Sequence, residues 1–147
     1  MELLAPVSGT VLRLEEVPDP VFGPGMMGGG AAIQPPAGRS IAVVSPVSGT
    51  VMKARHHALI VRAADGVVLI HLGIDTNSLD GLGFSLEISK GDELEAGQRV
   101  GTWDTIAATE QGRSTCTVVV VLESDPKAIE VDSGREVDAG EAFFSVP

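Results

Sequence analysis

Short segments rich in Val, Ile, Leu and Thr recur along the chain, and Gly, Pro, Asp or Ser separates them. Such residues favour strands, and the separating residues favour turns. Apolar residues with sustained helical spacing are missing, so only two short helices are predicted, at 104–110 with Asp104 as N-cap and at 126–130 after Asp125. The predicted fold is therefore all-β, an antiparallel β-sandwich or barrel with one or two short helices. The predicted strands lie at 4–12, 41–52, 58–63, 67–72, 99–103, 117–123 and 141–146.

Two pairs of similar segments indicate an internal duplication. Pro6-Val-Ser-Gly-Thr-Val11 recurs unchanged at 46–51, and Gly91-Asp-Glu-Leu-Glu-Ala-Gly97 resembles the segment at 134–140. A solenoid would repeat a short period many times. Two pairs instead predict a duplicated half-motif in one pseudo-symmetric sandwich, so we expect residues 1–147 to form a single domain.

A glycine-rich run at 23–30 superficially resembles a phosphate-binding loop. It lacks the Gly-Lys-Ser/Thr ending and the following helix that such a loop needs. We therefore expect this run to form a flexible surface loop.

Charge and cysteine content exclude several classes of protein. With 20 acidic and 10 basic residues the net charge is −10, which is unfavourable for nucleic-acid binding. No apolar run is long enough to cross a bilayer, and no basic-then-apolar leader opens the chain, so membrane insertion is not expected. The single cysteine, Cys116, precedes a valine-rich run, so we expect a buried and unreactive thiol. These features predict a soluble cytoplasmic protein.

All three histidines fall within a short window, at His56, His57 and His71. Residues 63–66 read as a hairpin turn, with His57 opening one strand and His71 ending its partner. An odd number of loop residues would place these two imidazoles on the same face of the hairpin, and an even number would place them on opposite faces. A histidine pair can bind a metal, act as acid and base, or accept a phosphoryl group on one ring. The alternative is a pair of partly buried histidines satisfied by backbone carbonyls, and His56 is expected to be exposed.

Several ordered motifs resemble the glucose-type IIA domain of the bacterial phosphoenolpyruvate-dependent sugar phosphotransferase system. Each motif is weakly specific, but their order along the chain is specific, and the antiparallel β-sandwich of that family agrees with the strand pattern. The motifs are Ala5-Pro-Val-Ser-Gly9, Val17-Pro-Asp-Pro-Val-Phe22, Met26-Met-Gly28, Ser45-Pro-Val-Ser-Gly-Thr50, His57-Ala58, His71-Leu-Gly-Ile-Asp-Thr76 and Gly81-Leu-Gly-Phe84.

The resemblance implies a phosphocarrier of sugar transport with His71 as phosphoryl acceptor and His57 as a donor to the phosphate. We expect the His71 ring to be held by a backbone carbonyl, that of Gly73, which leaves the other ring nitrogen free to attack. The family match places Asp75 and Asp19 at the rim of the site. For each aspartate, a turn or cap role is the structural alternative.

The resemblance also implies partners. The phosphoryl donor is the histidine-containing protein HPr, and the acceptor is a cysteine on the IIB domain of a sugar permease. Val21, Phe22, Met26 and Met27 match the apolar docking collar of the family. No cofactor is implied, and a metal bridging His57 and His71 would occur only in a complex with a partner. Regulatory partners are a further option in this family.

Two alternatives come from other classes of protein. A zinc peptidase on a duplicated β-scaffold would use His57, His71 and Asp75 as ligands, although no HxH or HExxH spacing is present. A biotinyl or lipoyl carrier domain would be modified at Lys53, within an incomplete Met-Lys-Met-like motif. One departure from the family pattern is that Arg55 and His56 stand where a threonine is expected.

Overall fold

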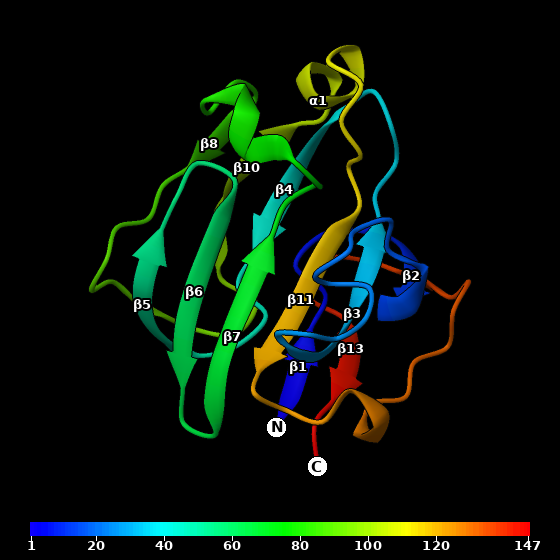
Figure 1. Ribbon diagram of the computed structural model, residues 1–147. Coiled ribbons are helices and arrows are strands. Elements are labelled where there is room, and N and C mark those ends of the chain that lie inside the picture. Colours follow the sequence, from blue (N-terminus) through cyan, green and yellow to red (C-terminus); the bar gives the residue numbers. More distant parts are fainter.

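An eight-stranded antiparallel sheet forms the larger layer of the computed structural model, which describes residues 1–147 (Figure 1). Strands β7 and β11 lie side by side at its centre, and the shortest strands, β9 and β12, lie at its two edges. In order across the sheet, the strands are β12 (Glu136–Val137), β2 (Gly9–Arg13), β3 (Gly28–Gln34), β11 (Thr117–Leu122), β7 (Gly66–His71), β6 (Ala58–Ala63), β5 (Gly49–Ala54) and β9 (Glu93–Leu94).

Two smaller antiparallel sheets complete the structure. One has the order β4 (Ser40–Val44), β10 (Arg99–Asp104), β8 (Phe84–Leu86), and the other pairs β1 (Glu2–Leu4) with β13 (Ala142–Ser145). Four short helices connect strands: η1 (Leu14–Glu16), η2 (Thr76–Leu79), α1 (Ile106–Glu110) and η3 (Pro126–Ala128). None of them is long and apolar enough to span a membrane. The predicted antiparallel β-sandwich is confirmed.

Alternate residues of the central strands pack on opposite faces of the large sheet, as strand geometry requires. Val119 and Val121 join a core of 25 buried residues that draws on all three sheets. Val118 and Val120 face the other way, into a smaller cluster with Leu14. This outer cluster consists of Leu14, Val17, Ala32, Ile74, Cys116, Val118 and Val120. The large sheet is therefore apolar on both faces at its centre, and the segment after β2 covers the outer one.

The internal duplication is visible in the pairing of strands. Thr10 of β2 lies opposite Glu136, and Thr50 of β5 lies opposite Glu93. In each copy the threonine hydroxyl donates to the opposite carboxylate, at 2.5 Å to Glu136 and 2.6 Å to Glu93. Because the two copies stand at opposite ends of the sheet, the β11–β7 pair lies at the centre of a pseudo-symmetric arrangement.

Several boundaries differ from those predicted. The segments 4–12 and 41–52 each divide into two strands, because bends at 6–8 and 46–48 interrupt them at the repeated Pro-Val-Ser. Helix α1 begins at Ile106 with Thr105 as N-cap, although Asp104 Oδ1 still accepts a hydrogen bond from the Ile106 N–H at 3.1 Å. The predicted turn of helix after Asp125 is present as η3.

The prediction of a flexible loop is wrong at the end of the glycine-rich run. Gly28, Gly29 and Gly30 are buried and begin β3, between β2 and β11. A Cβ on Gly28 or Gly30 would overlap the carbonyl oxygen of Val121 or Val119. Glycine is thus required here because the backbones of β3 and β11 approach too closely for a side chain.

We expect Gly30→Ala to lower the free energy of unfolding by about 3 kcal/mol, because the methyl group meets a backbone carbonyl that cannot move without disturbing the sheet. Urea unfolding measures this change. The matched control is Gly66→Ala in β7, where the added Cβ meets only side-chain atoms of Met1 and Val121, at 3.1 and 3.4 Å. Equal stabilities of the two variants would contradict the close-approach explanation.

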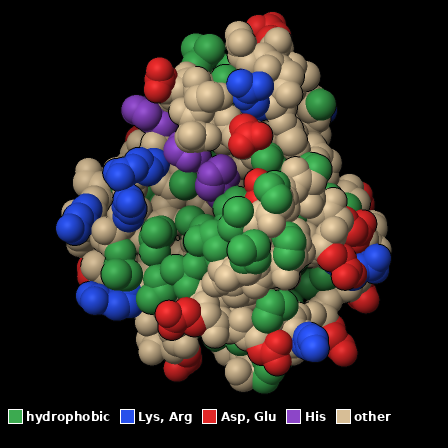
Figure 2. Space-filling model, viewed as in Figure 1, with side chains coloured by type: hydrophobic (Ala, Val, Ile, Leu, Met, Phe, Trp, Pro, Cys, Tyr) green, Lys and Arg blue, Asp and Glu red, His purple; other side chains and the backbone are tan.

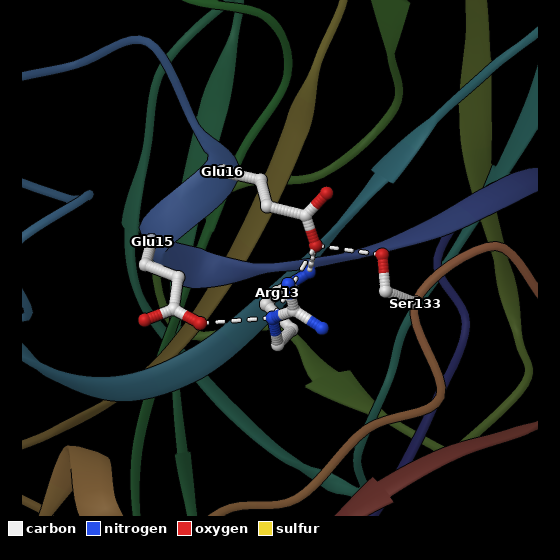
Figure 3. Close-up of polar contacts among 4 residues, drawn as sticks. All are labelled: Arg13, Glu15, Glu16 and Ser133. Atoms are coloured by element: carbon white, nitrogen blue, oxygen red, sulfur yellow. Dashed lines mark hydrogen bonds and ion pairs between the residues drawn. The ribbon is translucent and has the colours of Figure 1, made fainter.

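A polar cluster fixes η1 to a distant loop (Figure 3). Arg13 Nε donates to Glu15 at 2.8 Å, and the Ser133 hydroxyl donates to Glu16 at 2.6 Å. The bond from Ser133 lowers the pKa of the Glu16 carboxyl, helped by the Arg13 backbone N–H. Exposed contacts of this kind add little stability by themselves. They do fix the start of the 17–27 segment, which approaches the histidines.

Candidate functional site: a histidine pair beside an apolar loop

His71 is the last residue of β7, at the centre of the large sheet. It lies opposite Val118 of β11 and Ala58 of β6. Alternation along the strand directs Val68 and Ile70 into the main core, so His71 emerges on the outer face. The sheet thus supports the His71 backbone on both sides while the imidazole remains half-buried.

The alternation of side chains along the β6–β7 hairpin does not explain why His57 lies beside His71. The β6–β7 loop contains two residues, an even number, and Ala58 is the residue paired with His71. His57 precedes β6 in a bend, and its carbonyl accepts a hydrogen bond from the Leu72 N–H at 2.8 Å. The two imidazole centroids are 4.9 Å apart at an interplanar angle of 72°. Departure from strand geometry at His57 therefore brings the rings together.

The expected hydrogen bond from the His71 ring to a backbone carbonyl is present. Nδ1 of His71 lies 2.6 Å from the carbonyl oxygen of Gly73. Because a carbonyl only accepts, Nδ1 carries the proton, and Nε2 keeps its lone pair. Gly73 has φ +81°, and a Cβ there would overlap the side chain of Thr76. The tight turn after β7 thus sets the tautomer of His71.

Aromatic side chains surround the pair. Phe22, from the 17–27 segment, contacts His71 with ring centroids 5.4 Å apart. Phe84 of β8 lies 6.4 Å from His57 and stacks on Trp103 at 5.3 Å. Trp103 is completely buried, so this stack anchors the His57 side of the site in the main core. The role of Phe84 and Trp103 was missed by sequence reasoning, although Phe84 ends one of the motifs of the family resemblance.

Burial keeps both histidines neutral near pH 7. Desolvation lowers the pKa of His57 to about 4, and the charges of His71, His56 and Arg55 act in the same direction. Desolvation also lowers the pKa of His71, opposed by the Gly73 carbonyl and by Asp19 and Asp75. A neutral imidazole with a free ring nitrogen is a nucleophile, and a neutral imidazole N–H is a hydrogen-bond donor.

This shift predicts a pH dependence of stability. The unfolded chain protonates His57 near its ordinary pKa of about 6.5, whereas the folded protein resists protonation down to about pH 4. The stability that depends on neutral His57 is therefore complete above about pH 6.5 and falls as the pH is lowered toward about 4. We expect urea unfolding to show a steeper loss over this interval for the wild type than for His57→Gln. Parallel pH profiles would contradict the assignment.

The two rim aspartates have different local roles. The Asp19 carboxylate accepts hydrogen bonds from the Val21 and Phe22 N–H groups at 2.9 and 2.8 Å, which fixes the turn that presents Phe22. Asp75 has φ 58° and precedes η2, where its carbonyl accepts from Ser78. The turn role considered for Asp19 is thus present, while its charge also acts on His71.

Apolar side chains adjoin the histidines on one face of the molecule, and basic side chains gather on the other side of the pair (Figure 2). Of the residues matched to a docking collar, Val21, Met26 and Met27 are 41%, 73% and 37% exposed. Phe22 is half-buried against the outer cluster. His56 and Arg55 are exposed, as expected for His56.

The structure does not support the sequence alternatives. No three His, Cys, Asp or Glu side chains lie close enough to hold a metal ion, so His57, His71 and Asp75 do not form the ligand set of a peptidase. Lys53 lies within β5 and not at the tip of a turn. Cys116 is buried as predicted, and burial raises the pKa of its thiol to about 11, which makes it a poor nucleophile.

The antiparallel sandwich and its neutral histidine pair fit the class of phosphocarrier domains. A sequence profile described as "phosphoenolpyruvate-dependent sugar phosphotransferase system, EIIA 1" matches residues 1–127. The chain therefore belongs to this EIIA family and is a phosphotransferase component of the system.

Relatives and a solved structure agree with this assignment. A glucose-specific EIIA component of Bacillus cereus is 40% identical over 126 residues, which cover 84% of this chain and 74% of the relative. A glucose-specific EIICBA component of Streptococcus pneumoniae is 38% identical over 99% of this chain, which corresponds to 20% of that longer protein. The glucose permease IIA of Mycoplasma capricolum matches with a TM-score of 0.85 and 32% identity, over 98% of this chain and 94% of that one.

Proposed function

We propose that His71 accepts a phosphoryl group on Nε2 from phosphorylated HPr and passes it to a cysteine of a IIB domain, for uptake and phosphorylation of glucose. The observation that supports this most directly is the hydrogen bond between His71 Nδ1 and the Gly73 carbonyl, which leaves Nε2 as the nucleophile. The glucose assignment rests on relatives named as glucose-specific components. The proposed reaction uses no cofactor, and the proposed location is the cytoplasm.

In the first step, Nε2 of His71 attacks phosphorus, a new N–P bond forms, and the N–P bond of the HPr phosphohistidine breaks. In the second, the cysteine thiolate attacks phosphorus, an S–P bond forms, and the His71 N–P bond breaks. Phosphoryl transfer requires mainly positioning and charge stabilisation. His57, neutral and 4.9 Å from His71 between ring centroids, is placed to donate a hydrogen bond to the transferred oxygens.

The surroundings of His71 suit onward transfer of the phosphoryl group and the docking of more than one partner. Asp19 and Asp75 favour a positive charge on His71, so they repel a dianionic phosphoryl group and keep phosphohistidine from becoming too stable. The apolar collar of Val21, Phe22, Met26 and Met27 offers a surface on which two different partners can dock, because methionine side chains repack easily.

We also propose that residues 1–147 act as a single domain. Leu3 of β1 lies opposite Phe144 of β13, and both belong to the main core. The residues after the profile match at 1–127 thus pack with those at the start of the chain.

The function is tested by incubating the protein with phosphoenolpyruvate, enzyme I and HPr and measuring its intact mass. The expected product has one added phosphoryl group that is acid-labile, as phosphohistidine is, and that is lost when IIB is added. Absence of the group, with HPr shown to be phosphorylated, contradicts the proposal. A lysine-linked addition at Lys53 would point to the carrier alternative instead.

Docking on the collar predicts that Met26→Glu raises KM for the partners by about tenfold and leaves kcat nearly unchanged, because a charge replaces an exposed apolar contact. Steady-state transfer kinetics with HPr and with IIB measure this. Ile106→Glu is the matched control, because Ile106 is also an exposed apolar residue, at 41%, but lies on α1 and outside the collar. An equal rise in KM for both variants would contradict a specific role of the collar in docking.

A further inference from the structure

A groove of about 530 Å³ lies between β5 and the loop that joins β8 to β9. Lys53, Arg55 and Lys90 line it together with Met52 and Ile88, and none of its lining residues is acidic. We call it the cationic groove. In a chain with 20 acidic and only 10 basic residues, a lining of three cations and no acid reverses the overall charge. Asp92 lies at the border of the groove, where its carboxylate accepts a hydrogen bond from the Ser89 N–H at 2.8 Å. Arg55 is two residues from His57, so the cationic groove adjoins the histidine pair.

None of these three cations is neutralised by an ion pair within the chain. The ion pairs of the structure are formed by Arg13 with Glu15 and Glu16. Lys53, Arg55 and Lys90 make no ion pair, and their side chains donate no hydrogen bond within the chain. Their charges are therefore available to an external anionic group.

An irregularity in the backbone of β5 determines the direction of the Lys53 side chain. Val51 pairs with Val61, but Lys53 pairs with Ile60, because a bulge shifts the register between them. An unshifted register would place Lys53 opposite Leu59, which is 2% exposed and belongs to the main core. The bulge turns Lys53 to the outer face instead. Since β9 pairs only with Gly49 and Thr50, residues 52–54 also have no strand on that side.

We propose that the cationic groove binds an acidic segment of a protein partner that docks on the histidine pair. This inference rests on the proposed function. A protein segment fits better than a small anion, because the exposed Met52, the partly buried Ile88 and the open edge of β5 offer contacts that inorganic phosphate cannot use. The remaining surface, with a net charge of −10 over the whole chain, repels acidic groups. Binding of the acidic segment in the cationic groove thus orients the partner relative to the histidine pair.

The test uses the double charge reversal Lys53→Glu/Lys90→Glu, with KM and kcat measured separately for HPr and for IIB at low and at near-physiological ionic strength. Arg39→Glu/Lys127→Glu is the matched control, because it makes the same change in net charge at two exposed cations outside the groove. We expect KM for the partner with the acidic segment to rise about tenfold at low ionic strength, with kcat preserved, and the difference from the control to shrink as salt screens the charges.

Equal KM values for the groove variant and the control, with both partners, overturn the inference while leaving the proposed function intact. A failure of the wild type to accept a phosphoryl group would instead overturn the proposed function. Titration with inorganic phosphate, followed by amide chemical shifts, gives a further outcome. One possible result is saturable shifts at Lys53 and Lys90 in the wild type, with partner KM values unchanged in the groove variant. This result would show that the groove binds a small anion, and it would overturn the proposal that the groove binds a protein segment.

Discussion

The His71→Gln variant is expected to lose phosphoryl uptake from HPr by at least about a thousandfold, because glutamine has no ring nitrogen that can form the N–P bond. The turn after β7 is also held without the imidazole, because the Thr76 hydroxyl donates to the Leu72 carbonyl at 2.6 Å. The local turn should therefore survive the substitution. Gel-shift and intact-mass analysis after incubation with phosphoenolpyruvate, enzyme I and HPr measure the loss.

His56→Gln is the matched control for this experiment. His56 is exposed and lies next to His57 in the chain, so its replacement changes a histidine without removing the proposed nucleophile. We expect uptake by this control to equal that of the wild type. Uptake that persists in His71→Gln and disappears in His57→Gln would reverse the two assignments.

The second large effect is expected for His57→Gln, which should still accept the phosphoryl group but pass it to IIB about 10²- to 10³-fold more slowly. The imidazole of His57 is neutral, with a pKa lowered to about 4, and can stabilise the charge that develops on the transferred oxygens. Its position depends on the bend before β6 and on contact with Phe84, 6.4 Å away between ring centroids. Glutamine offers a donor without that ring packing, so the donor is poorly held.

Single-turnover transfer from the purified phosphorylated variant to IIB isolates this step from uptake. The unfolding midpoint of each variant, measured near pH 7, separates a loss of transfer from a loss of folding. A transfer rate equal to that of the wild type would show that His57 supports His71 only by packing.

Much of the fold could be predicted because strands and turns are local features. The hairpin of β6 and β7 follows from two apolar runs and the turn between them, and the duplication was visible as repeated segments. β3 could not be predicted, because its need for Gly30 arises from the approach of Val119, a residue far along the chain. The local sequence pattern does not reveal a contact between residues that lie so far apart in the chain.

The candidate site also has one part that could be predicted from the sequence and one part that could not. The Gly73 carbonyl is two residues from His71, so its hydrogen bond could be anticipated from the sequence. The approach of His57 depends on a bend whose geometry overrides strand parity, and the support from Trp103 depends on a stack between β8 and β10. Both arise from tertiary packing, and neither has a periodic signal.

The pairing of β1 with β13 has a consequence for how this domain can be tethered. Met1 and Val146 exchange two backbone hydrogen bonds of 2.8 Å, so the two ends of the chain emerge together (Figure 1). Strand β7 runs away from that end, and His71 is its last residue. A flexible linker at either end would leave the histidines facing outward, and its length would set the effective concentration of His71 at a neighbouring acceptor.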